Sequence, residues 1–150
     1  MEDGLIVYRR NLPHWRLSGS YYFVTWRLDP EQSDLSEDER DVVAAAIKFF
    51  SDQRYRLCAY VVMDDHCHTV LQPLDGHSLQ SIMYTWKSFT TSQLHRLGLR
   101  AGQLWQREYF DRIIRNEDEF WEKVTYIINN PRKRMPEVDK YVWAEWFAFE

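Results

Sequence analysis

The most restrictive feature of this 150-residue sequence is a pair of strand-like runs, residues 55–63 and 66–72, separated by only two residues. Both runs are rich in the apolar, β-branched and aromatic residues that favour strands. The intervening Asp64-Asp65 is typical of a tight turn, and Pro73 ends the second run. Because so short a connection joins antiparallel neighbours, the pattern predicts a β-hairpin.

Two further segments have the composition of strands. Residues 21–28 (YYFVTWRL) end at Asp29-Pro30, and residues 109–115 follow a loop around Gly102. Aspartate, proline and glycine are common where a strand gives way to a turn. The sequence therefore predicts four strands, and the hairpin supplies the second and third of them along the chain.

Three segments have the periodicity of amphipathic helices, and each begins at a residue that favours the N-cap. The caps are Ser36, which opens a capping box, Ser78 and Asn116. Gly98 is placed to close the second helix. The third is expected to stop at Pro131, because proline lacks the N–H that would continue it.

The resulting order is βαββαβα. Two helices on one face of a four-stranded antiparallel sheet form the ferredoxin-like split βαβ arrangement, an α+β fold. The other sheet face would be left for a ligand or for the additional C-terminal helix. No internal repeat or linker divides the chain, so a single catalytic domain over residues 1–150 is expected.

Composition bears mainly on location and partners. No signal-peptide pattern opens the chain and no apolar run is long enough to span a bilayer, so we expect a cytoplasmic protein without a membrane partner. Cys58 and Cys67 fall inside strand-like runs, which predicts reduced core residues. The net charge is −4, but residues 29–41 alone contribute −6 and the remainder carries +2. Overall acidity therefore does not exclude a nucleic-acid partner.

His66-Cys67-His68 lies on the second strand of the predicted hairpin. Side chains alternate along a strand, so both imidazoles leave one face and the thiol leaves the other. Two ring nitrogens can therefore converge on one ion, whereas a zinc site that also uses Cys67 is disfavoured. Taken alone, two histidines on one strand face are more often surface or hydrogen-bonded residues.

The third helix places a tyrosine away from its apolar stripe. At about 100° per residue, the stripe consists of Phe120, Trp121, Val124, Ile127 and Ile128. Tyr126 falls on the far side, and Asn130, four residues later, shares that side. An exposed aromatic residue is common. Together with the paired histidines, however, this pair could supply a metal site and a hydroxyl nucleophile.

These residues lie in motifs that resemble the REP-associated tyrosine transposases, a family within the single-tyrosine branch of the HUH endonucleases and transposases. The resemblance covers nearly the whole chain. Its segments are YRR at residues 8–10, LPH at 12–14, YFVT at 22–25, VVMDDHCHTVLQP at 61–73, WQREYFD at 105–111, IR at 114–115, YIINNP at 126–131 and, more weakly, YVW at 141–143.

The resemblance implies that His66 and His68 hold a divalent ion, which we expect to be Mg²⁺ or Mn²⁺, and that Asn130 completes the metal site. It implies that Tyr126 is the nucleophile. The implied substrate is a DNA hairpin with a short single-stranded guide at its foot. The family pattern usually has Pro-Asn before the first histidine. This chain has Asp64-Asp65 there, which leaves the turn conformation and the local charge open.

We therefore predict a metal-dependent single-stranded DNA endonuclease and strand transferase, which cleaves at or near a hairpin and leaves a 5′-phosphotyrosine bond and a free 3′-OH. Trp26 or Trp105 could stack on bases. Candidate phosphate contacts are Arg9, Arg10, Lys87, Arg107, Arg112, Arg115 and Lys133. A monomer and a homodimer both stay open, as does action of the tyrosine in its own subunit or in a partner.

Three other functions fit parts of the sequence. A catalytically silent, hairpin-binding regulator of the same fold would not need the tyrosine and both histidines, all of which are present. An RNA-recognition module would need the glycine-and-aromatic signature that the first and fourth predicted strands lack. A zinc-dependent hydrolase would need a glutamate base next to its ligands, and the chain has no His-Glu-x-x-His element.

Overall fold

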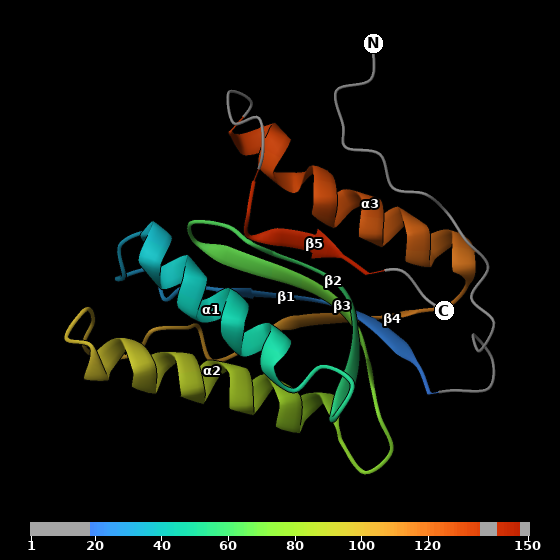
Figure 1. Cartoon of the computed structure of the whole chain (residues 1–150), viewed down its shortest axis with the longest axis horizontal. Helices are drawn as coiled ribbons and strands as arrows, with labels where there is room; N and C mark the ends of the chain where they lie inside the picture. Colours follow the sequence, from blue (N-terminus) through green and yellow to red (C-terminus); the bar gives the residue numbers. More distant parts are fainter. Residues whose placement is uncertain (1–18, 136–140, 148–150) are drawn as a thin grey trace.

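A computed structural model describes residues 19–135 and 141–147. The elements are, in order, β1 (Tyr21–Arg27), α1 (Glu37–Phe49), β2 (Tyr55–Val62), β3 (His66–Pro73), α2 (Leu79–Arg96), β4 (Phe110–Ile114), α3 (Glu117–Arg134) and β5 (Ala144–Trp146). All strand pairs are antiparallel, and the sheet order is β4-β1-β3-β2-β5 (Figure 1). The prediction of a ferredoxin-like α+β fold is confirmed.

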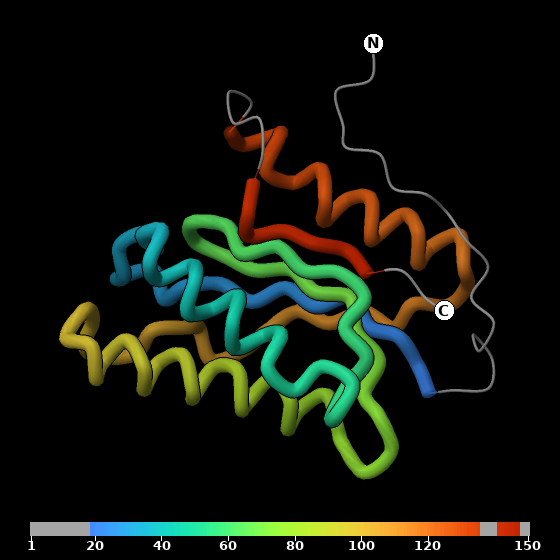
Figure 2. Tube along the Cα trace, in the orientation of Figure 1, coloured from blue at the N-terminus to red at the C-terminus, as the bar shows by residue number. Residues whose placement is uncertain are grey.

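The sheet lies between two helical layers. Helices α1 and α2 cover one face, and α3 covers the other (Figure 1). The chain trace in Figure 2 shows the β2–β3 hairpin running through the middle of the molecule, between α1 and α3. The sheet face that the sequence left for a ligand or a further helix is therefore covered, at least in part, by the C-terminal helix.

The face under α1 and α2 is packed with aromatic side chains. Trp26 stacks on Trp86 with ring centroids 5.3 Å apart, and Trp105 meets Trp26 edge-on at 6.2 Å. Trp26 and Trp105 are only 1% and 3% exposed. The suggestion that either tryptophan stacks on DNA bases is therefore wrong, because both rings are enclosed in the core.

The face under α3 is apolar over much of its area. All five residues of the predicted helix stripe are buried there, and Phe120 meets Tyr21 edge-on at 5.3 Å. The N-cap prediction is also confirmed, since the Asn116 side chain accepts a hydrogen bond from the backbone N–H of Glu119. This packing fixes how α3 lies across the sheet.

Two features of the C-terminal region differ from expectation. Helix α3 does not stop at Pro131 but continues to Arg134, with Pro131 buried and its carbonyl accepting from the N–H of Met135. Burial of the ring and this following hydrogen bond sustain the last turn despite the missing proline N–H. Strand β5 was not predicted, because three residues are too few to display alternation; it pairs with β2.

Several smaller predictions are confirmed. Asp64 and Asp65 form the turn between β2 and β3, and Gly98 follows α2 with a φ of 72°. Cys58 and Cys67 are buried free thiols. In the described part of the chain, no helix has the length and apolar character needed to cross a membrane.

Candidate active site

The two histidines of β3 point toward α3. Their ring centroids are 4.8 Å apart, and both side chains are buried, with exposures of 6% for His66 and 4% for His68. Cys67, between them, packs in the opposite core under α1 and α2. The alternation predicted from the strand pattern is therefore confirmed, and the thiol is excluded from any site that both imidazoles share.

A hydrogen-bond partner occupies the Nδ1 atom of each histidine. Thr25 Oγ1 lies 2.7 Å from His68 Nδ1, and Asp65 Oδ1 lies 2.7 Å from His66 Nδ1. An ionised carboxylate only accepts hydrogen bonds, so it favours the tautomer of His66 with the proton on Nδ1. Among the described residues, neither Nε2 atom has a hydrogen-bond partner. Engagement of one nitrogen with the other left open is the usual state of a metal-binding histidine.

His68 is held in its neutral form. Burial lowers the pKa of its imidazole to about 3, and the nearby charges of His66 and Arg27 add to this effect. Phe23 stacks against the ring, with centroids 5.3 Å apart and planes 19° from parallel. A neutral imidazole keeps a lone pair on one nitrogen, so His68 can coordinate a metal throughout the physiological pH range.

Tyr126 reaches the histidine pair from α3 of the same chain. Its ring meets His68 edge-on with centroids 5.4 Å apart, and its side chain is 40% exposed. Lys133 Nζ lies 4.9 Å from the centroid of the Tyr126 ring. Lys123 is similarly placed over Phe23, at 5.1 Å. The Tyr126 ring is therefore partly open to solvent and is contacted by the His68 imidazole and the Lys133 ammonium.

Asn130 lies one turn beyond Tyr126 on α3. Although it is on the side of the helix away from the apolar stripe, it is only 9% exposed. No hydrogen bond involves its side chain among the described residues. Its amide can therefore contact water or a ligand.

The two aspartates before His66 are connected to the end of α3. Arg134 forms ion pairs with Asp64 and Asp65, both at 3.1 Å. Burial acts to raise the pKa of the Asp65 carboxyl, but the hydrogen bond with His66 and the charge of Arg134 together lower it. The Asp64-Asp65 turn thus orients His66 and binds the helix that carries Tyr126.

Sequence reasoning missed several residues that support the site. Asp65 and Thr25 orient the histidines, Arg134 connects α3 to the turn, and Lys123 adds a cation. The adjacency of Asp65 and His66 was visible in the sequence. Thr25 could have been found only from the pairing of β1 with β3, in which it lies opposite His68.

The donor set includes few protein atoms. In the described ranges, no three His, Cys, Asp or Glu side chains converge where they could hold a metal ion. Two imidazoles and the Asn130 amide would leave several positions of an octahedral ion to water or substrate oxygens. Such open coordination is typical of Mg²⁺ sites that act on phosphates.

The predicted DNA-contacting cations fall into three groups. Lys133 lies at the site, and Arg112 on β4 is paired with Glu119. Lys87 and Arg107 line a groove between α2 and residues 103–109, where Lys87 Nζ donates to the Arg107 carbonyl at 2.9 Å.

Three predicted cations remain. Arg115 follows β4 and is exposed. Arg9 and Arg10 lie outside the described residues.

Two sequence comparisons bear on this chain. A family model described as IS200-like transposase matches residues 17–130, which include both histidines, Tyr126 and Asn130. The REP-associated tyrosine transposase of Escherichia coli (strain K12) is 27% identical over 127 residues, which cover 84% of this chain and 72% of that protein. The resemblance seen in the sequence motifs is thereby confirmed.

Two solved structures share the fold. A REP-associated tyrosine transposase bound to a REP hairpin matches with a TM-score of 0.69 and 24% identity, over 93% of this chain and 82% of that one. A candidate transposase from Deinococcus radiodurans matches with a TM-score of 0.54 and 16% identity, over 69% and 85%. Because the family model spans most of the sequence, including both histidines, Tyr126 and Asn130, the chain belongs to the IS200-like transposase family.

Proposed function

We propose that this protein is a metal-dependent single-stranded DNA endonuclease and strand transferase, in which Tyr126 attacks a phosphodiester at or near a DNA hairpin. One observation carries the proposal. The Tyr126 ring lies 5.4 Å from the His68 ring, on the sheet face that also presents His66. The side chains that we assign as nucleophile and as metal donors therefore lie close together within one chain.

The residues present fit a divalent ion. Both Nδ1 atoms have partners, which leaves the two Nε2 atoms as donors, and the buried Asn130 amide has no partner among the described residues. We infer that His66, His68 and Asn130 hold Mg²⁺ or Mn²⁺. When bound, such an ion would polarise the phosphate and stabilise the departing oxygen.

Tyr126 is open to an incoming strand, since it is 40% exposed, and Lys133 Nζ lies 4.9 Å from the centroid of its ring. As the phenol oxygen bonds to phosphorus, the bond to the 3′ oxygen breaks; the phenol proton passes to solvent and the 3′ oxygen takes up a proton. The product is a 5′-phosphotyrosine bond, which conserves the bond energy for rejoining.

The proposed substrate is hairpin DNA with an unpaired flank. One structural relative was solved with a REP hairpin bound. Tyr126 is half-open to solvent between α3 and the sheet. A phosphodiester inside a regular duplex is hard to place in line with a tyrosine carried on a helix, whereas an unpaired strand can bend into position.

The test uses a fluorescent hairpin oligonucleotide with unpaired flanks and either Mg²⁺ or Mn²⁺. Wild type should form a covalent protein–DNA adduct that survives denaturing electrophoresis. Tyr126→Phe should bind the hairpin equally well and form no adduct. Tyr22→Phe, a tyrosine packed against the core under α1 and α2, is the matched control and should react normally.

Two results would redirect the proposal. Normal cleavage by Tyr126→Phe would show that another residue is the nucleophile. Tight hairpin binding by wild type with no cleavage in either metal would favour the catalytically silent regulator.

A further inference from the structure

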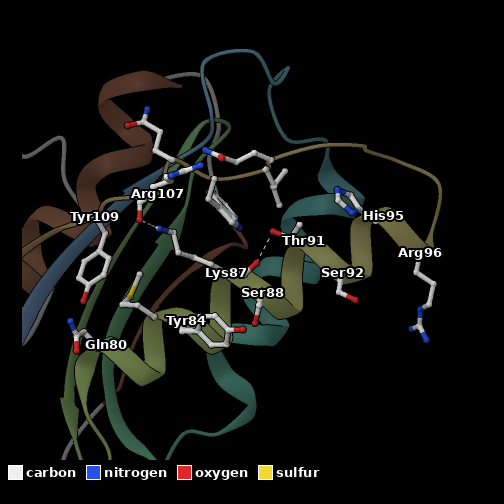
Figure 3. A pocket seen from close by; sticks show the side chains of 15 residues that line it. Gln80, Tyr84, Lys87, Ser88, Thr91, Ser92, His95, Arg96, Arg107 and Tyr109 are labelled. Atoms are coloured by element: carbon white, nitrogen blue, oxygen red, sulfur yellow. Dashed lines mark hydrogen bonds between the residues drawn. The ribbon is translucent and has the colours of Figure 1, made fainter.

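A cationic groove lies between α2 and residues 103–109, away from the histidine pair. It has a volume of about 1010 Å³, and its lining includes Tyr84, Lys87, Arg96 and Arg107 (Figure 3). None of the described residues that line it is Asp or Glu, although the chain as a whole carries a net charge of −4. A concentration of positive charge without acidic partners favours a polyanion.

The groove also presents aromatic rings. Tyr84 on α2 is 73% exposed, and Tyr109 stands across from it, with Lys87 Nζ 5.6 Å from the Tyr109 ring centroid (Figure 3). Grooves that combine cations along a backbone path with exposed aromatic rings are typical of single-strand binding, because every unpaired base has a face that can stack. In a duplex those faces are already stacked on neighbouring bases.

A second cavity connects this groove with the edge of the sheet. It has a volume of about 530 Å³, shares Gln106 and Tyr109 with the groove, and is also lined by one cation and one carboxylate, Arg27 and Glu108, and by Thr25 and Phe110. The backbone explains its position. The pairing of β1 with β4 ends at Thr25 and Phe110, and the next hydrogen bond runs from the Gln106 N–H to the Arg27 carbonyl at 2.9 Å. Residues 107–109 thus leave the sheet between the Gln106–Arg27 hydrogen bond and the Phe110–Thr25 pair.

Phe110 brings this path to the active site. It is 59% exposed on the edge strand, and it lies opposite Thr25, whose hydroxyl contacts His68. Directly paired residues share a sheet face, and Thr25 is on the face with the histidines. Its exposed ring is therefore available to a base on the sheet face that carries the histidines.

We propose that the groove, the second cavity and Phe110 form one track for the unpaired arm of the DNA. On this track Lys87 and Arg107 contact phosphates, while Tyr84 and Phe110 stack on bases. The inference rests on the proposed function, which it extends by assigning a path to the strand that leads to the cleaved bond. The track begins on the α2 side of the sheet and ends beside His68 and Tyr126.

Equilibrium binding of the full chain to two hairpins tests the track. Both hairpins have the same stem; one has a long unpaired arm and the other an arm of only a few nucleotides. EDTA is included so that no cleavage occurs. Tyr84→Ser and Arg107→Gln should each weaken binding of the long-armed hairpin about tenfold. For Arg107→Gln the slope of log affinity against log salt should also fall by about 0.7.

Phe89→Ser is the matched control. Phe89 is a 50% exposed aromatic residue on the same helix, but it lines a different cavity, between α1 and α2. This variant should bind both hairpins as wild type does. Circular dichroism on all three variants separates loss of binding from loss of structure, and crosslinking of a photoreactive base in the arm to the wild-type chain gives a second reading that needs no variant.

The outcomes are distinct. Unchanged binding of the long-armed hairpin by both groove variants would overturn the track, and so would crosslinks that avoid the groove. Equal loss on both hairpins would mean that the groove holds the duplex stem, which also overturns it. Adduct formation on the long-armed hairpin with Mg²⁺ is measured separately. Its absence in wild type would count against the proposed function and not against the track.

Discussion

The two faces of the sheet bury polar groups in different ways. Under α1 and α2, the polar atoms of the aromatic core bond to one another: Trp86 Nε1 donates to the Tyr55 hydroxyl at 3.1 Å, and Trp105 Nε1 to Thr90 Oγ1 at 2.8 Å. Under α3, the two histidines keep an open Nε2 atom each, and Asn130 has no partner among the described residues.

This difference separates stability from function. Buried polar groups are usually hydrogen-bonded. On the first face the indole N–H groups of Trp86 and Trp105 are bonded and the aromatic core serves packing, although the buried Thr69 hydroxyl has no partner among the described residues. On the second face the apolar residues of α3 fix the helix, while its remaining residues present Tyr126 beside His68. Variants on the two faces should therefore fail in different assays.

The largest effect is expected on the sheet face under α3, which carries the histidines. Changing both His66→Ala and His68→Ala should lower the nicking rate about 10⁴-fold, or about 5 kcal/mol in the barrier, because the ion would lose both imidazole donors. EDTA should have the same effect on wild type. Nicking of the hairpin with Mg²⁺ is the measurement, and undiminished activity in the double variant would remove the metal role.

A variant on the face under α1 and α2 should lose stability instead of activity. Trp26→Ala should lower the free energy of unfolding by about 3–5 kcal/mol, because it leaves a large cavity beside Trp86. Tyr126→Phe should change it by less than about 0.5 kcal/mol. Urea denaturation compares the two. A large loss of stability in Tyr126→Phe would mean that the tyrosine serves packing rather than chemistry.

The pH dependence of stability should report the burial of His68. Its pKa is about 3 when folded, mainly because of burial, against about 6.5 when unfolded. The unfolded chain therefore binds the additional proton, so the stability is complete above pH 6.5 and declines as the pH falls toward 3. At pH 5 the loss is about 2 kcal/mol.

Urea titrations in EDTA measure this pH dependence. His68→Gln should abolish that part of it. An identical acid dependence in wild type and variant would contradict a neutral, buried His68.

The smallest effect is expected from Thr25, whose hydroxyl contacts His68. Thr25→Val removes the hydroxyl that contacts His68 Nδ1 while keeping the shape of the side chain. Loss of such a partner typically weakens metal binding, and we expect about a tenfold rise in the Mn²⁺ concentration needed for half-maximal nicking. Thr69→Val, on the buried neighbour of His68 in β3, is the control. Equal shifts in both variants would point to general loosening of the sheet.

Local patterns predicted much of the fold and of the site. The hairpin, the helix caps and the apolar stripe of α3 depend on residues close in sequence. The shared face of His66 and His68 follows from strand alternation alone. Tyr126 could be assigned to the side of α3 away from its apolar stripe, because helical geometry fixes the relative directions of side chains within one helix.

Features that depend on distant pairing could not be predicted. Contact between Thr25 and His68 requires the register of β1 on β3, and the bridge from Arg134 to Asp65 requires α3 to pass Pro131. The burial of Trp26 and Trp105 depends on how α2 closes over the sheet. In each case tertiary packing, which no local pattern encodes, decided the outcome.

The central claim is that Tyr126 becomes joined to DNA. Wild type incubated with the hairpin and Mn²⁺ would be digested with nuclease and protease, and the nucleotide-bearing peptide identified by mass spectrometry. A single modified peptide is expected, with the phosphate on Tyr126. A phosphate on another residue, such as the exposed Tyr84, would contradict the assignment of Tyr126 as the nucleophile.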